Sequence, residues 1–217
     1  MRPAHHEGGD GRASGLRRQH THAGQLRQPA HRMRTQRTEV RILYDAVALY
    51  VGARMYDSLG ARGVRSYLTP RDQQTDGDYL ELISDTFHDH TGRTVFQINP
   101  AGVKTDAGQA ASNADPSWDP IWEAVSTIDS LGWTAELRIP FAQLRFSRDT
   151  AQTWGLQIWR YVDRLNESSM WSWWARKATG GRPEFGHVEG LRIRERPRGV
   201  EILPYVVSRA AYVPIRD

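Results

Sequence analysis

The stretch GWTAELRIPF, residues 132–141, decides the fold of this chain. Apolar and polar residues alternate in it one by one: positions 133, 135, 137 and 139 are apolar, and the three between them are polar. A period of two residues is typical of a β-strand with one face in a core and the other toward solvent. Pro140 lacks a backbone donor, so we expect the strand to end there and one helical turn to follow at 141–144.

Similar short stretches occur on both sides of this one. Residues 39–44 (EVRILY) and 48–56 (ALYVGARMY) are joined by three residues and predict a β-hairpin. No long helical period interrupts the strands, which argues against alternating strand–helix units. We therefore predict an all-β protein, an antiparallel β-sandwich of jelly-roll-like type. The other expected strands are 79–87, 94–99, 103–106, 122–128, 154–162, 170–174 and 186–193.

The positive charge is confined to the beginning of the chain. The whole sequence has 29 basic and 25 acidic residues, a net charge of +4. Residues 1–36 hold seven arginines and two acidic residues, whereas residues 37–217 hold 22 basic and 23 acidic residues. A nearly neutral body lacks the basic surface that a phosphate backbone requires. We therefore expect no nucleic-acid partner for the folded part.

The chain divides into a polar tail and one domain. Residues 1–36 show no apolar period and cannot bury enough surface to offset their ordering entropy. We predict a disordered, Arg- and His-rich tail over 1–37 and a β-sandwich over 38–196. The length from 38 onward suits one domain with a core of its own.

Several functional classes have no signature in the sequence. There is no cysteine, which excludes disulfides, thiolate metal sites and a thiol nucleophile. No nucleophile elbow, phosphate-binding loop or zinc-protease motif is found. No apolar run reaches the roughly 18–20 residues of a membrane-spanning helix. No signal peptide is visible at the beginning of the chain.

All eight tryptophans lie between Trp118 and Trp174. One interpretation is a core rich in tryptophan; the other is an aromatic platform for a flat ligand such as a sugar ring. In an extended strand Trp171 and Trp173 share one face and Trp174 takes the other, so at least one should face away from the core. Arg176 follows as a hydrogen-bond donor. Trp118, in a predicted loop, is a further candidate ligand-binding residue.

Two polar clusters are candidate metal sites. Asp76, Asp78 and Glu81, with Asp72 before them, offer the oxygen ligands that suit a structural Ca²⁺. The alternative is a solvated acidic loop. No other cofactor is expected.

The second cluster surrounds one predicted turn. Asp85, His88, Asp89 and His90 could supply two imidazoles and a carboxylate to a metal. The alternative is a simple polar turn at the tip of a hairpin.

The sequence resembles a known family through three blocks. These are GWTAELRIPF at 132–141, DYLELISDTFHDHTG at 78–92 and FGHVEGL at 185–191. Together they are similar to the carbohydrate-binding module family 9-like domain, in the bacterial form that precedes a β-barrel-like domain. The ending over 197–217 resembles the start of that second domain, cut short here, which makes such a domain an expected partner.

The resemblance implies a β-sandwich that binds glucan- or xylan-type polysaccharides or oligosaccharides without catalysis. Such modules are accessory to O-glycosyl hydrolases, and some members bind structural calcium. It also implies a protein that is secreted, periplasmic or associated with the outer membrane. Two alternatives stay open. One is a structural or interaction module that has lost the sugar site and packs on the following domain, and the other is a glycoside hydrolase.

In the sugar-binding members two tryptophans hold the sugar. Their places match the stretch 71–77, which begins with the candidate Arg71, and a position near Thr179. Neither place has a tryptophan here, so Trp173 or Trp174 is expected to substitute. The family's first strand also has no counterpart in residues 1–36, and we therefore expect an exposed sheet edge there.

Overall fold

The structure is a computed structural model that describes residues 22–23, 25–27, 35–73, 76–110, 113–115, 118–172 and 185–194. The predicted start of a second domain at 197–217 and most of the predicted tail lie outside the described residues.

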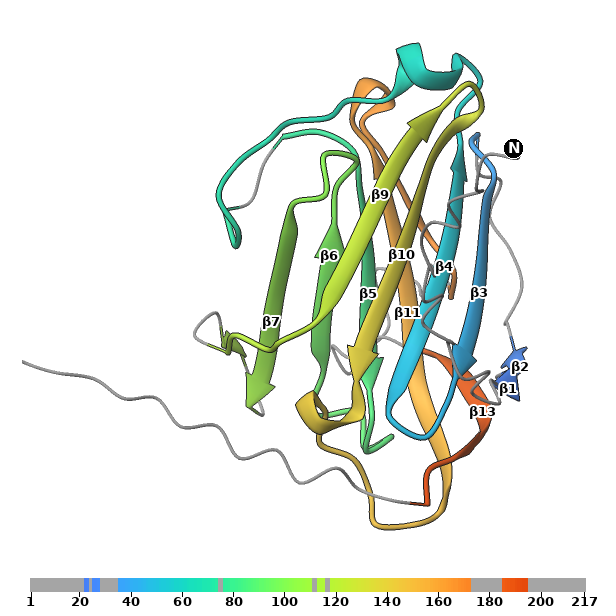
Figure 1. Ribbon diagram of the computed structural model, residues 1–217, viewed down its shortest axis with the longest axis vertical. Coiled ribbons are helices and arrows are strands. Elements are labelled where there is room, and N and C mark those ends of the chain that lie inside the picture. The colour runs from blue at the N-terminus through green and yellow to red at the C-terminus, as the bar shows by residue number, and fades with distance from the viewer. Residues whose placement is uncertain are drawn as a thin grey trace, which may run out of the picture.

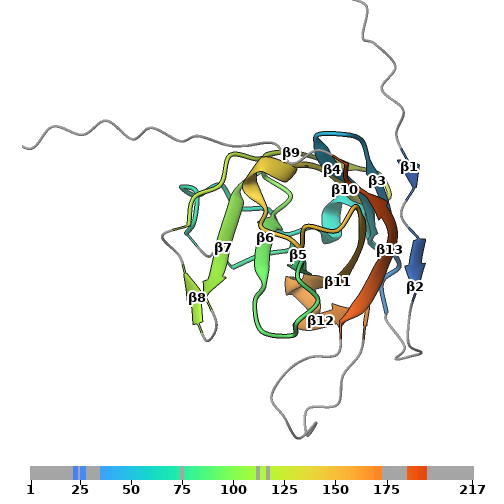
Figure 2. The ribbon, with the colours of Figure 1, turned by 90° about the horizontal axis from the view of Figure 1, so that it is seen from below.

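Two antiparallel sheets face each other as the layers of a sandwich (Figures 1 and 2). The five-stranded sheet has the order β1 (His22–Ala23), β3 (Thr38–Tyr44), β4 (Ala48–Tyr56), β10 (Gly132–Pro140), β9 (Glu123–Asp129). The eight-stranded sheet consists of β2 (Gln25–Arg27), β13 (Gly186–Arg192), β11 (Ala151–Val162), β5 (Tyr79–Asp85), β6 (Thr94–Ile98), β7 (Lys104–Ala110) and β8 (Asn113–Asp115), with β12 (Glu167–Met170) paired to β11. The short 3-10 helices are η1 (Gly60–Gly63), η2 (Phe141–Gln143) and η3 (Asp163–Leu165). The predicted all-β sandwich is confirmed.

The strand β10 lies inside the five-stranded sheet, as its alternation predicts. Its apolar residues from Trp133 to Ile139 face the core, and β4 and β9 pair along its two sides. Gly132 begins the strand with a φ of 134°, and a Cβ there would lie 2.2 Å from the backbone oxygen of Met55. Only glycine fits this turn. The helical turn expected after Pro140 is η2.

The core lies between the two sheets and is rich in aromatic residues. Trp122, Trp133 and Trp154 are buried, and Phe96 packs edge-to-face against Trp122. The interpretation of the tryptophans as core residues therefore holds for these three. Aromatic side chains bury large areas, which suits a sandwich with no long helix in its described part.

Three local predictions need correction. The strand expected from residue 170 onward is instead β12, which begins at Glu167 and ends at Met170, and a bend follows at 171–172. The strand expected at 103–106 is β7, which continues to Ala110, and a strand that was not predicted, β8, follows at Asn113–Asp115. Five residues of the predicted tail, in β1 and β2, pair with β3 and β13. Strand pairing uses backbone groups, so polar residues with no apolar period can join a sheet edge.

Among the described residues, the edge of the five-stranded sheet at β3 is paired over only a short length. On its outer side, β1 pairs only with Leu43 and Tyr44 among the described residues. Within the described part of the chain, the backbone of 38–42 therefore has no partner strand on this side.

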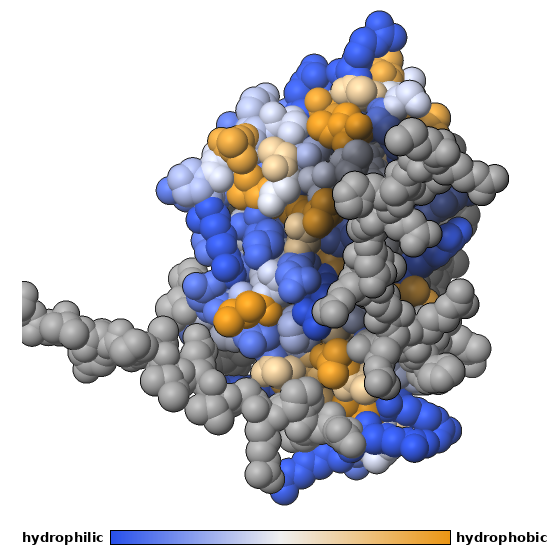
Figure 3. Space-filling view, in the orientation of Figure 1, coloured by the Kyte–Doolittle hydropathy of each residue, from blue (hydrophilic) through white to orange (hydrophobic). Residues whose placement is uncertain are grey.

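The outward surface of the five-stranded sheet is mostly hydrophilic. In Figure 3 its apolar residues form separate patches among polar ones. Val125 and Leu43 are exposed there, and Gly52 leaves open space beside them. Among the described residues, no helix has the length and apolar character required to cross a membrane.

Candidate functional site

Of the three tryptophans between 171 and 174, the structure describes only Trp171. Trp173, Trp174 and Arg176 lie outside them. Trp171 is half-buried and packs against the hydrophobic core. Its ring covers Gly186, where a Cβ would come within 2.0 Å of the indole. Trp171 therefore fills the space between β12 and β13, on the core side of the sheet.

Trp118 is also half-buried and lies at the margin of the core. Its ring packs edge-to-face on Phe96, with 5.7 Å between ring centroids. Gly108 lies under the indole, because a Cβ there would approach it to 2.9 Å. Trp118 closes one side of the sandwich and leaves part of its ring accessible.

Arg71 is held by a network of carboxylates. Its guanidinium lies 2.7 Å from Asp106, 2.5 Å from Asp119 and 3.4 Å from Asp72. Burial lowers the pKa of Arg71, but its three acidic neighbours outweigh this and raise it. Burial raises the pKa of Asp106, while hydrogen bonds from Trp122 and Arg71 oppose the shift. Arg71 thereby ties its loop to β7 and to the segment before β9.

The acidic residues proposed for calcium do not come together. Asp76 is exposed, Asp78 is buried, and Glu81 is half-buried on the opposite face of the β5 region from Asp78. Asp78 accepts a hydrogen bond from the backbone N–H of Asp163, and burial raises its pKa. Among the described residues, the acidic group that could hold a metal ion is instead Asp72, Asp106 and Asp119, and Arg71 is bonded to all three.

The eight-stranded sheet presents a row of polar and aromatic side chains away from the core. We call this surface the outer face; it is formed by Tyr79, Glu81, Gln97, Trp159 and Tyr161. Trp159, Glu81 and Gln97 are direct cross-strand neighbours on β11, β5 and β6. The residues between them along each strand are core residues such as Leu80, Leu82 and Ile158. Strand alternation therefore fixes the row on the side away from the core.

Glu81 is the one acidic group in that row. Burial raises its pKa, and the charge of Arg93 partly opposes the shift. Its carboxylate has no hydrogen bond or ion pair within the described part of the chain. A carboxylate in this setting is a strong acceptor for the hydroxyl groups of a ligand. Gln97 beside it offers both a donor and an acceptor.

Two tyrosines extend the row along the strands. The rings of Tyr79 and Tyr161 stack with 5.4 Å between centroids and 25° between planes. The hydroxyl of Tyr161 donates to the side chain of Asn166 at 3.1 Å. The outer face thus combines aromatic surface with hydrogen-bonding groups, which is the composition of a small-molecule site.

The chain leaves β12 toward Trp173 at a fixed point. The side chain of Gln157 accepts a hydrogen bond from the backbone N–H of Ser172 at 2.9 Å and donates to its carbonyl. Both residues are fully buried. We call this pair of bonds the Gln157 clasp. It fixes residue 172, from which the segment with Trp173 and Trp174 begins, opposite Gln157 and two residues along β11 from Trp159.

A histidine cluster lies at the other end of the same sheet. The ring of His88 is 4.6 Å from that of His187 and 5.1 Å from that of His90. Asp85 accepts hydrogen bonds from the backbone N–H groups of Asp89 and His90. Burial lowers the pKa of His88, and the two other imidazoles add to this. The structure thus assembles the turn that the sequence singled out and adds His187 from β13.

The sequence could not indicate this third histidine, because only the register of β13 with β11 and of β11 with β5 brings it there. Among the described residues, the histidines do not form a group with their ligand atoms close enough for one metal ion. Glu81, Gln97 and Trp159 were likewise not selected as a row, since the pairing of three strands brings them together.

No family model matches the chain, and no curated protein matches it. Solved structures match its fold. A carbohydrate-binding module family 9 from Caldicellulosiruptor kristjanssonii in complex with cellotriose aligns with a TM-score of 0.52 and 17% identity, over 83% of this chain and 89% of that chain. A similar module from the same organism in complex with glucose gives a TM-score of 0.51 and 16% identity, over 82% and 88%.

A putative carbohydrate-binding protein from Bacteroides uniformis aligns with a TM-score of 0.56 and 12% identity, over 77% of this chain and 84% of that chain. At these identities the likeness establishes the fold. The chain has the fold of family 9 carbohydrate-binding modules, as the sequence blocks predicted.

Proposed function

We propose that this chain is a non-catalytic carbohydrate-binding module and that a saccharide binds on the outer face. The observation that carries the proposal is the row of Trp159, Glu81 and Gln97, in which a carboxylate with no ion pair among the described residues lies beside an indole and an amide. Sugar rings present apolar C–H faces that pack on aromatic rings, and hydroxyl groups that hydrogen-bond to carboxylates and amides. Similarity in fold to modules solved with cellotriose and with glucose supports the same function.

The ligand class we propose is a glucan- or xylan-type saccharide. Such chains are neutral, and the outer face offers polar groups without a cluster of like charges. Trp173 and Trp174 complete the site in this proposal, because the Gln157 clasp starts their segment beside Trp159. The module would serve a glycoside hydrolase system in a secreted, periplasmic or outer-membrane-associated protein, next to a C-terminal β-barrel-like domain.

Isothermal titration of the chain with cello- and xylo-oligosaccharides tests the proposal. Glu81→Gln should weaken binding about 10- to 100-fold, since a charge-assisted hydrogen bond is worth about 1.5–3 kcal/mol. Trp173→Ala and Trp174→Ala should weaken it as well, because a stacking surface is lost.

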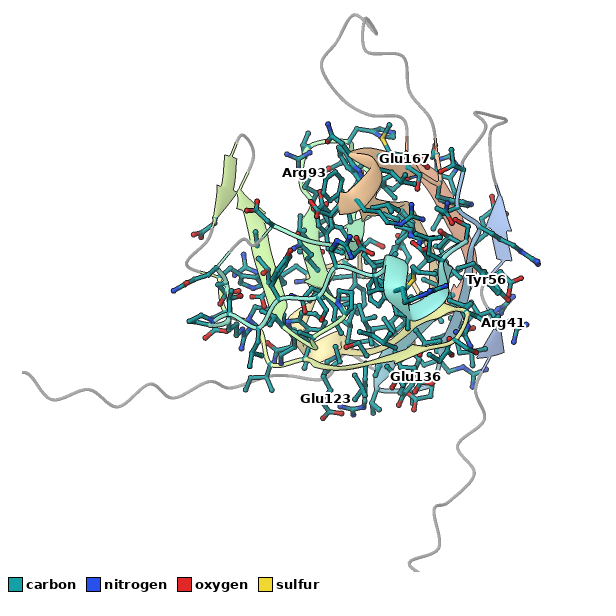
Figure 4. The ribbon with its side chains drawn as sticks, turned by 90° about the horizontal axis from the view of Figure 1, so that it is seen from above. Arg41, Tyr56, Arg93, Glu123, Glu136 and Glu167 are labelled. Atoms are coloured by element: carbon teal, nitrogen blue, oxygen red, sulfur yellow. The ribbon has the colours of Figure 1, made fainter. Side chains whose placement is uncertain are left out.

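Glu136→Gln is the matched control. Glu136 is exposed on β10 and faces away from the opposite sheet, as Figure 4 shows. The same chemical change there should leave affinity unaltered. If no glycan produces heat, the proposal fails, and the alternative of a module that packs on the following domain takes its place. Hydrolysis of aryl-glycosides by the isolated chain would contradict the non-catalytic role.

A further inference from the structure

Two cavities open at the end of the sandwich where β5 finishes and β6 begins, beside η2. Figure 1 shows these elements together at one end of the molecule. One has a volume of about 390 Å³ and the other about 310 Å³. Both are lined by Phe87 and Arg145, so we describe them together as the end groove. The end groove is distinct from the outer face: Ser84 and Thr94 line it, and both lie on the core side of their strands.

The groove has aromatic walls. Phe87 is 51% exposed although it is a large apolar residue next to a cavity. Trp118 lines the smaller cavity with the accessible part of its ring. Two aromatic surfaces at the mouth of a cavity suit a ring-shaped ligand. The volume of each cavity is at the lower limit for small-molecule sites, which corresponds to one or two sugar rings.

The charged lining of the groove is mainly basic. Arg145 borders both cavities, Arg148 borders the larger one and Arg93 the smaller one. None of the three guanidinium groups forms an ion pair or a hydrogen bond within the described part of the chain. By contrast, Arg54, Arg71 and Arg164 are each paired with an aspartate. Among the described residues, the groove thus holds three guanidinium groups without an ion-pair partner, and Asp115 is its one acidic lining residue.

The position of Arg145 is fixed by its neighbours. The hydroxyl of Thr86, directly after β5, donates a hydrogen bond to the backbone carbonyl of Arg145. Leu144 and Phe146 on either side of Arg145 are buried in the core. The backbone is thus anchored while the side chain is exposed at the cavity. An anchored guanidinium can pair with a carboxylate through two parallel hydrogen bonds.

We propose that the end groove is a second saccharide site, for sugars that carry a carboxylate, such as uronic acids. The carboxylate would pair with Arg145, with Arg93 and Arg148 contributing attraction from either side. The ring would pack on Phe87 and Trp118, and Gln143 and Asp115 would accept from its hydroxyls. This site does not depend on the proposed binding of neutral sugars at the outer face.

Titration of the full chain with glucuronate and galacturonate tests this, with glucose and galactose as uncharged partners of the same shape. We expect the uronates to bind and the neutral sugars to bind at least about tenfold more weakly at this site. Affinity should fall as salt rises, because exposed charges are screened. Equal heats from inorganic phosphate would reduce the groove to a general anion site and overturn the proposal.

Arg145→Gln removes the charge and keeps a side chain of similar length. It should weaken uronate binding about 10- to 100-fold. Arg41→Gln is the control, because Arg41 is exposed on β3 and Figure 4 places it on the other side of the sandwich from Arg93. Unchanged affinity in Arg145→Gln contradicts the proposal. Phe87→Ala, at an exposed position, provides a second variant that should also lose affinity.

The two proposed sites can be distinguished by measuring the binding of both ligand classes to each variant. Glu81→Gln should weaken binding of cello-oligosaccharides and leave uronates unaffected, while Arg145→Gln should do the reverse. If the chain binds cello-oligosaccharides but not uronates, the proposal for the end groove alone is contradicted. If it binds uronates but not cello-oligosaccharides, the proposal for the outer face alone is contradicted.

Discussion

At the scale of single residues, Glu81 connects the stability of the sheet with its proposed function. Its carboxylate is partly withdrawn from water, and among the described residues it interacts electrostatically with Arg93 and with the hydroxyl of Tyr79. Burial raises the pKa of Glu81 above its ordinary value of 4.5, so the folded protein favours the protonated form. The ionised carboxylate of Glu81, which the proposed function requires, therefore lowers the stability of the folded protein.

The pH dependence of Glu81 follows from this sign. Because its pKa is higher in the folded state, its contribution to stability is greatest at low pH and is lost as pH rises from 4.5 through the folded-state pKa. Saccharide affinity should change in the opposite direction, since the ionised carboxylate is the better acceptor. Titration calorimetry and thermal melts between pH 4 and 8 measure both trends.

Glu81→Gln should remove both trends and melt at a higher temperature than the parent chain at neutral pH. Glu136→Gln, at an exposed position, should keep both trends. Affinity that increases as pH falls would contradict the assigned role of the carboxylate.

At the scale of elements, the Gln157 clasp joins β11 to the end of β12. It satisfies two backbone groups of Ser172 at a point where the strand pairing has ended and water is excluded. Gln157→Leu should leave both groups without partners and cost about 2 kcal/mol, a fall in Tm of about 4–8 °C. Hydrogen exchange at the Ser172 amide should accelerate, and saccharide affinity should fall with it.

Gln143→Leu is the comparison for this prediction. The side chain of Gln143 accepts one hydrogen bond at an exposed site, from the backbone N–H of Ile121 at 3.2 Å. Its replacement should change Tm by much less. If both substitutions lower Tm by the same amount, the two buried hydrogen bonds of the Gln157 clasp do not contribute more to stability than the exposed hydrogen bond of Gln143.

The elements also show how far the sequence predicts this structure. Strand β10 and the hairpin of β3 and β4 follow from alternation, because a half-buried strand needs an apolar residue at every second position. Strand β12 was expected too late in the chain, since ESSM has no such pattern and joins the sheet through its backbone. The row of Trp159, Glu81 and Gln97 was missed because it depends on the register of three strands, which local sequence does not contain.

At the scale of the whole molecule, charge and fold are separate properties of the chain. Residues 37–217, which include most of the sandwich, hold 22 basic and 23 acidic residues. Seven arginines lie before them, in residues 1–36. Of residues 1–34, the described part joins the sheets only through the two residues of β1 and the three of β2. The net charge of +4 therefore comes from residues 1–36, which precede most of the sandwich.

A chain that begins at Thr35 should keep the sandwich and both proposed sites, because the core and the two sheets remain. Loss of the short pairings of β1 and β2 should lower stability by less than about 2 kcal/mol. The full chain should be retained on a sulfonate cation exchanger, which carries no uronic acid, at low salt and released as salt rises, whereas the shortened chain should pass through. Equal retention of both chains would locate a basic surface on the sandwich itself. That result would reopen the question of a polyanionic partner, and the Arg145→Gln variant would then show whether the end groove is that surface.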